Sequence, residues 1–135
     1  MLAKVYSMAV LGIDAFLIGI EADLSDMLPG LTIVGLPDGA VRESRERVMS
    51  AIKNCGFEFP NRKVTINMAP ADMKKEGSGY DLPIAVGLLM ASGQVKNMPL
   101  REYIVLGELS LDGTIRPVKG VLAMAIKARE MGIKR

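Results

Sequence analysis

The stretch PADMKKEGSGYDLPIA, residues 70–85, joins an apolar segment to a helix-like one through a loop of glycine, serine and lysine. Three interpretations are open for this loop: a Ser-Lys active site, a phosphate cradle, or simply the start of a helix. Asp81 has the right chemistry for an N-cap, and Pro83 falls in the first turn, where its missing N–H costs little. The loop therefore predicts a helix over residues 81–93, whichever chemistry it carries.

Apolar periodicity extends this prediction outward in both directions. It indicates strands over residues 3–10, 15–24 and 31–35, a helix over 36–56, a strand over 62–70, the helix over 81–93, a hairpin over 103–118 and a helix over 120–132. We expect Asp38 to cap the helix that carries Val41, Val48, Met49, Ile52 and Cys55 on its inner face. The order β-β-β-α-β-α-β-β-α predicts one α+β domain, with helices on one face of a mixed sheet.

The composition excludes several kinds of site. The 135 residues include no histidine, which removes His-containing triads, His-Cys zinc sites and imidazole bases. Cys55 is the single cysteine, so no disulfide can form within the chain, and we expect a cytoplasmic location. No apolar run approaches the ~20 residues of a membrane helix, so we expect no membrane partner.

The loop at residues 70–85 lacks a phosphate-binding signature. A P-loop requires the string GxxxxGK[ST], and GSGYD supplies only a fragment of a dinucleotide fingerprint. Asp72, Glu76 and Asp81 outnumber Lys74 and Lys75, which disfavours strong capture of an anion at the helix start. We expect no cofactor and no metal in this segment.

A Ser-Lys hydrolase is the remaining catalytic alternative. Its nucleophile would be Ser78, the only serine of the loop, and its base would be Lys75 or Lys119 with a pKa lowered by burial. The simpler interpretation is that the Ser78 hydroxyl bonds nearby backbone in a glycine-rich turn.

Basic side chains offer candidate contacts to DNA. The string RESRER places Arg42, Arg45 and Arg47 on one helix, although i,i+4 pairing of Arg42 with Glu46 and of Glu43 with Arg47 would neutralise much of this patch. Lys74 and Lys75 are further candidates, and Tyr80 could stack on a base or pack at the edge of the core. All six residues are also candidates for contact with a neighbouring subunit: Arg42, Arg45, Arg47, Lys74, Lys75 and Tyr80.

The charge of the chain is uneven along its length. Residues 1–30 carry one lysine against four carboxylates, whereas residues 116–135 carry six basic side chains against Glu130 alone. The basic end is typical of a solvated helix face, or of a surface that meets nucleic acid or an acidic partner. The acidic and basic ends could also stack head to tail in a ring.

Three strings carry a family resemblance that extends over essentially the whole chain: GLPDGAVRESRERV (35–48), NMAPADMKKEGSGYDLPIAVGLL (67–89) and VLGELSLDGTIRPVKGVL (105–122). Together they resemble the N-terminal domain of the ComM/YifB family, bacterial AAA+ ATPases often labelled magnesium-chelatase-like. The resemblance implies a fold similar to the Lon proteolytic domain and to a ribosomal protein domain 2, with a left-handed β-α-β crossover. It also implies a hexameric ring, an AAA+ module that uses ATP and Mg2+, and a role in DNA branch migration during recombination and natural transformation.

The likeness to Lon proteases can be followed residue by residue. Lys75 and Gly77 match the KDG of the Lon string KDGPSAG, but Ser78 takes the place of its proline and Gly79 the place of its serine nucleophile. The position of the Lon catalytic lysine falls on Leu122. The resemblance therefore implies a vestigial, non-catalytic site. We expect residues 1–135 to form a single domain that is truncated at its C-terminus, with the AAA+ module downstream.

Overall fold

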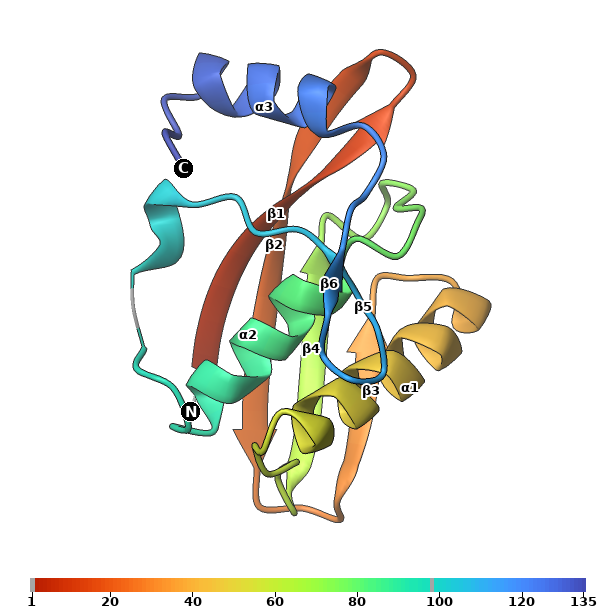
Figure 1. The fold of residues 1–135 in the computed structure, drawn as a ribbon, viewed down its shortest axis with the longest axis vertical. Helices are drawn as coiled ribbons and strands as arrows, with labels where there is room; N and C mark the ends of the chain where they lie inside the picture. The colour runs from red at the N-terminus through yellow and green to blue at the C-terminus, as the bar shows by residue number, and fades with distance from the viewer. Residues whose placement is uncertain (1, 98) are drawn as a thin grey trace.

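Four strands form the central sheet of this computed structural model, which describes residues 2–97 and 99–135 (Figure 1). The sheet has the order β1-β2-β4-β3, where the strands are β1 (Leu2–Leu11), β2 (Asp14–Ser25), β3 (Gly30–Val34) and β4 (Lys63–Ala69). β2 pairs antiparallel with both β1 and β4, whereas β3 lies parallel to β4. The predicted mixed sheet and the α+β class are confirmed.

Two helices cover one face of this sheet, α1 (Asp38–Asn54) and α2 (Asp81–Ala91). Alternate residues of the strands point toward them, and the side chains of Val64, Ile66 and Met68 on β4 are fully buried, as predicted. α1 contributes Val48 and Ile52 to the same core, also as predicted. Cys55 is exposed instead, because it lies one position beyond the last residue of α1.

Both predicted N-caps are wrong by one residue. Pro37 is the N-cap of α1 and Tyr80 the N-cap of α2, and neither cap makes a side-chain hydrogen bond to the helix. Asp38 and Asp81 are therefore the first helical residues. The carboxylate of Asp81 is used for tertiary contacts described below, which compete with the local capping bond that an aspartate at this position would otherwise form.

The remaining elements are short. They are the 3-10 turn η1 (Leu100–Glu102), β5 (Glu108–Leu109), β6 (Ile115–Arg116) and α3 (Val121–Glu130). In Figure 1, β5 and β6 lie in front near α1 and α2, the turn η1 after α2 is at the left edge, and α3 is at the top. The hairpin predicted over residues 103–118 forms around Asp112, whose carboxylate accepts from Thr114 N at 2.9 Å, but its paired strands are only two residues long. Residues 103–107 instead run beside β1, where Val105 N donates to Tyr6 O at 2.9 Å.

The third helix does not share the face covered by α1 and α2. Met124 and Ala128 of α3 pack with Met8 and Ala15 of the β1–β2 hairpin. Met8 lies between Ser7 and Ala9 on β1, so its side chain points to the opposite face from Ala9, which belongs to the main core. The prediction that all helices lie on one face is therefore wrong for α3, whose small core covers the distal part of the hairpin.

Residues 133–135 form no strand, but they lie beside the segment that follows η1. The Arg135 carbonyl accepts a hydrogen bond from Ile104 N at 2.8 Å, and its guanidinium pairs with Glu102 at 3.0 Å. α1 is the longest helix of the described residues at 17 residues, and none of these helices has the length and hydropathy of a membrane span.

Candidate functional site

A buried carboxylate lies directly after the glycine loop and joins three elements. Asp81 is 1% exposed and accepts from Ser44 Oγ at 2.8 Å and from Arg47 Nε at 2.6 Å, both on α1. The same carboxylate accepts from Leu109 N of β5 at 3.1 Å. Each oxygen of Asp81 is thus hydrogen bonded, and the residue holds α1, α2 and the β5–β6 hairpin together.

Arg47 is the charge partner of this carboxylate. Its hydrogen bond to Asp81 raises the pKa of the guanidinium above its usual value, against the effect of burial. Glu43, one turn earlier on α1, lies 3.8 Å from Arg47 and forms the i,i+4 pair that the sequence predicted. Within the described residues, the other predicted pair, Arg42 with Glu46, is not among the ion pairs.

Lys75 is buried inside the glycine loop rather than exposed on it. Its ammonium donates to Pro70 O at 2.5 Å and to Met73 O at 2.8 Å, and the residue is 2% exposed. Burial lowers the pKa of this ammonium. Both acceptors are carbonyls of the same loop, so the side chain fixes the path of residues 70–75.

The hydroxyl of Ser78 is bound to a carboxylate. Ser78 Oγ donates to Glu108 Oε2 at 2.5 Å, which links the loop to β5. Ser78 and Lys119 line the same cavity of about 710 Å³, but Lys119 is exposed and the Ser78 hydroxyl is bound to Glu108. In this arrangement neither candidate lysine accepts the proton of Ser78.

The resemblance to Lon proteases assigned the dyad positions to Gly79 and Leu122, neither of which carries a reactive group. At Gly79 an added Cβ would lie 3.0 Å from Val118 Cγ1, so a larger residue requires a shift of that side chain. Leu122 lies on the surface of α3 and is 75% exposed.

Tyr80 packs at the edge of the core and is 4% exposed. Burial, with a smaller contribution from Glu76, raises the pKa of Tyr80 to about 12. Its ring faces are therefore covered, as in the core-edge interpretation, and it offers little surface for stacking on a base.

The remaining basic candidates differ in whether their charged groups are exposed or bound within the chain. Arg45 Nη2 donates to Leu31 O on β3 at 2.5 Å, so its guanidinium covers the outer edge of the sheet. Lys74 is 73% exposed and pairs with Glu76 at 2.9 Å, which raises the pKa of Lys74 and lowers the pKa of Glu76. Arg42 is exposed. Of the six predicted contact residues, only Arg42 and Lys74 present their charge at the surface.

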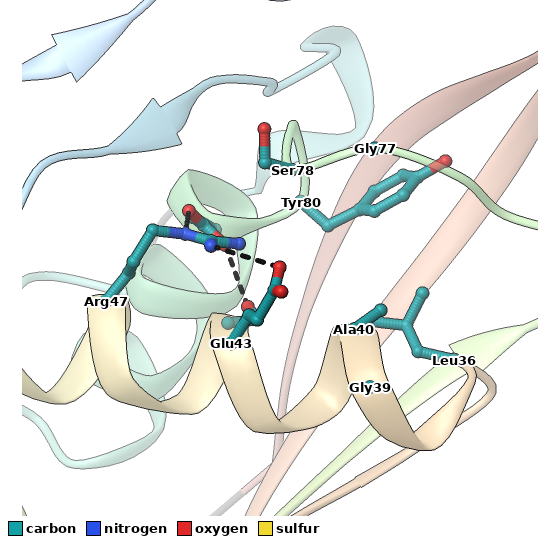
Figure 2. A pocket seen from close by; sticks show the side chains of 10 residues that line it. Leu36, Gly39, Ala40, Glu43, Arg47, Gly77, Ser78 and Tyr80 are labelled. Carbon is teal, nitrogen blue, oxygen red and sulfur yellow. Dashed lines mark hydrogen bonds and ion pairs between the residues drawn. The ribbon is translucent and has the colours of Figure 1, made fainter.

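A groove of about 380 Å³ separates the start of α1 from the glycine loop (Figure 2). Leu36 and Tyr80 lie toward one end, and Arg47 with Glu43 toward the other. Sequence reasoning did not select Ser44 or Asp81 as members of this groove, nor Glu108 as the partner of Ser78. The position of Asp81 two residues before Pro83 suggested only a helix cap. Nothing in the local sequence links Asp81 to Arg47 and Ser44, which lie 34 and 37 residues away.

Comparison with known proteins assigns the family. Residues 20–135 match the family described as subunit ChlI of Mg-chelatase. This chain belongs to the ChlI family. Over 131 residues it is 53% identical to the uncharacterized protein YifB of Salmonella typhimurium, a match that covers 97% of this chain and 26% of that relative. Over 129 residues it is 45% identical to the competence protein ComM of Haemophilus influenzae, covering 96% and 25%. The predicted ComM/YifB membership is confirmed.

A more distant similarity leads to Lon proteases. Over 133 residues the chain is 26% identical to the Lon protease of Mycolicibacterium smegmatis, which covers 93% of this chain and 17% of that relative. This weak similarity fits the predicted resemblance to Lon. The chain spans about a quarter of the length of the curated YifB and ComM relatives that it matches.

Proposed function

We propose that this chain is a non-catalytic, Lon-like domain of a ComM/YifB-type ATPase and that it serves in assembly of the ring. The observation that supports this proposal best is the internal use of its polar groups. Arg45, Arg47, Lys75 and Ser78 each bind a carbonyl or carboxylate of the same chain. A site whose charged groups are bound in this way is organised for structural precision rather than for turnover or for capture of phosphate.

The Lon-like part of the proposal rests on the topology as well as on the similarity. In Figure 1, β3 and β4 both run upward, α1 lies on the viewer's side of the sheet, and β4 is to the left of β3. This arrangement supports a left-handed crossover, which is rare among β-α-β units and is what the resemblance implies. The proposal includes a cytoplasmic hexamer. Its AAA+ module, which lies outside this N-terminal domain, uses ATP and Mg2+ for DNA branch migration.

DNA binding by this domain is the second candidate function. It is favoured by the exposed Arg42 and by the basic end of the chain, where Arg129 and Lys134 are exposed beyond the middle of α3. Contact with phosphates releases counterions, so such binding would fall steeply as the salt concentration rises. The third candidate, a Ser-Lys hydrolase that uses Ser78, is disfavoured because the Lys75 ammonium is bound to Pro70 O and Met73 O, while the Ser78 hydroxyl is bound to Glu108.

Sedimentation and fluorescence anisotropy separate these functions. An assembly domain gains mass with its own concentration in the absence of DNA. A DNA-binding domain instead raises the anisotropy of single-stranded or branched DNA at low salt, and Arg42→Ala weakens this effect. Arg42 is the better test residue than Arg45, because loss of the Arg45 bond to Leu31 would also disturb the sheet edge. Labelling of Ser78 by a serine-directed acylating probe would overturn the non-catalytic assignment.

A further inference from the structure

The outer face of α3 carries two apolar side chains between two cations. Leu122 and Ile126 are 75% and 52% exposed, and Lys119 and Arg129 are exposed on either side of them. Leu122, Ile126 and Arg129, spaced by four and three residues, lie in one line along α3, and Lys119 lies just before the N-cap of this helix, Gly120. We call this line the α3 ridge. Its apolar residues are the kind that a surface helix normally buries.

The tip of the β1–β2 hairpin enlarges the same apolar surface. Leu11 and Ile13 are 60% and 93% exposed at this tip. The tip lies against the start of α3, since an added Cβ at Gly120 would be 2.6 Å from Val10 Cγ2. Ridge and tip therefore lie near each other at one end of the molecule, where Figure 1 shows α3 beside the hairpin.

The groove between α1 and the glycine loop is a hollow with an acidic border, whereas the ridge protrudes and is bordered by cations. Its open stretch is lined by small or apolar groups, and an added Cβ at Gly39 or Gly77 would meet nothing within 4 Å. Figure 2 shows Leu36, Gly39 and Ala40 together on this side of α1. We call this hollow the α1 groove.

Carboxylates border the α1 groove. Glu43 lines it with 76% of its side chain exposed, and Asp38 is exposed in the first turn of α1. Glu76, in the residue before Gly77, is 72% exposed but pairs with Lys74 at 2.9 Å, so Glu43 and Asp38 carry most of the negative charge at this border. Arg47 offsets this border only in part, because it pairs with the buried Asp81 at 2.6 Å and lies 3.8 Å from Glu43.

The acidic N-terminal segment expected from the sequence is not an equivalent partner surface. Glu21 lies opposite Lys4 in the register of β1 and β2, and Asp26 pairs with Arg62 at 2.9 Å. Asp14 and Asp23 are exposed but lie near opposite ends of β2, so the acidic residues of this segment form no single acidic surface. The acidic counterpart of the basic end is therefore the α1 groove.

We propose that the α3 ridge of one copy of this chain docks into the α1 groove of a second copy. This inference rests on the proposed assembly function and identifies the two surfaces through which copies of the chain would make contact. Leu122 and Ile126 enter the open space above Gly39, while Lys119 and Arg129 approach the carboxylates at the border. Because ridge and groove lie on different elements, each copy keeps one surface free after docking. The contact is heterologous, as ring formation requires.

The chemistry of the ridge favours a protein partner over nucleic acid. Phosphates would be bound by Lys119 and Arg129 but would leave the side chains of Leu122 and Ile126 without a role. Pairing of one ridge with another would bring like charges together, which is unfavourable. The groove supplies both the apolar space and the opposite charge.

Sedimentation velocity of the 135-residue chain over a concentration series up to millimolar tests the inference. One variant, Leu122→Ser with Ile126→Ser, removes the ridge. A second, Gly39→Met, fills the groove without a clash, since the added atoms enter open space. Leu28→Ser is the matched control, because Leu28 is 88% exposed far from both surfaces in the turn between β2 and β3. Circular dichroism verifies that each variant is folded.

We expect the unaltered chain and the Leu28 control to gain mass with concentration, and each surface variant to associate at least about tenfold more weakly. A mixture of the two surface variants should form dimers and stop there, because it contains one intact ridge and one intact groove. Association that survives both variants overturns the assigned surfaces and leaves the assembly function standing. A chain that stays monomeric at every concentration overturns the assembly function as well.

Discussion

Two regions invert the usual rule of polar outside and apolar inside. The first comprises the Asp81 cluster, which is Asp81 with Ser44, Arg47 and Leu109, and the neighbouring Lys75 of the glycine loop; the second is the α3 ridge. In the first region, Asp81 and Lys75 are 1% and 2% exposed. In the second, Leu122 and Ile126 are 75% and 52% exposed. Buried charges that are fully paired belong to the framework of a fold, whereas exposed apolar groups gathered on one surface indicate a contact with another molecule. The glycine loop, whose serine and lysines suggest a reactive site, is thus the structural region. Helix α3, which carries no such motif, is the candidate for function.

The largest expected effect is at the centre of the first region. Asp81→Ala leaves Arg47 without its charge partner and leaves Ser44 Oγ and Leu109 N without an acceptor. Removal of one member of a buried pair typically costs about 3–5 kcal/mol in the free energy of unfolding. Urea unfolding followed by circular dichroism measures this loss.

Glu43→Gln is the matched control for that variant, because Glu43 contacts the same arginine from the surface at 3.8 Å. Exposed i,i+4 pairs contribute about 0.3–0.5 kcal/mol, so little stability should be lost. Equal effects of Asp81→Ala and Glu43→Gln would show that the Asp81 cluster is no more than another surface ion pair.

Lys75 and Lys74 offer the next test, since they are adjacent in sequence and opposite in environment. Lys75→Ala removes the donor to Pro70 O and Met73 O and empties buried space, with an expected loss of about 2–3 kcal/mol. Lys74 is 73% exposed, so Lys74→Ala should change the free energy of unfolding by less than about 0.5 kcal/mol. The same urea titrations compare them. If the Lys75→Ala variant proves as stable as the Lys74→Ala variant, Lys75 does not fix the path of the loop.

The difference between these two lysines shows where sequence reasoning succeeds and where it stops. Alternation of apolar residues gave the order of elements correctly, because that periodicity is local and repeats over many residues. No local rule distinguishes Lys74 from Lys75, or tells that Asp81 will bind Arg47 rather than cap its own helix. The face chosen by α3 was also missed, since a 10-residue helix with apolar residues on several sides specifies no single partner.

A third prediction concerns the joint between the α3 ridge and the hairpin. Gly120 has φ of 84° at the N-cap of α3, and an added Cβ would lie 2.6 Å from Val10 Cγ2. Gly120→Ala should therefore destabilise the protein by about 1–2 kcal/mol through backbone strain alone. Hydrogen exchange should show the loss mainly in α3 and leave α1 protected. Uniform loss of protection would mean that the two regions unfold as one unit.

The pH dependence of stability probes the core edge at Tyr80. Its pKa of about 12 in the fold exceeds the value of about 10 of a free tyrosine, so the folded state holds its proton more tightly. The contribution of Tyr80 is complete below pH 10 and is lost as the pH rises from about 10 through 12. Urea midpoints at pH 9 and pH 11 should fall less for Tyr80→Phe than for the unaltered chain. Identical falls would indicate an exposed hydroxyl.

The smallest expected effect on stability is at the α3 ridge. A small effect there would show that the exposed side chains of the ridge do not belong to the core. Leu122 is 75% exposed, so Leu122→Ser should change the free energy of unfolding by less than about 0.5 kcal/mol. Differential scanning calorimetry at low protein concentration measures this without interference from association. The same substitution in Leu109, which is 4% exposed, should cost several times more. If Leu122→Ser proves equally costly, the side chain belongs to the core of the fold and cannot be the free surface that a second copy would bind.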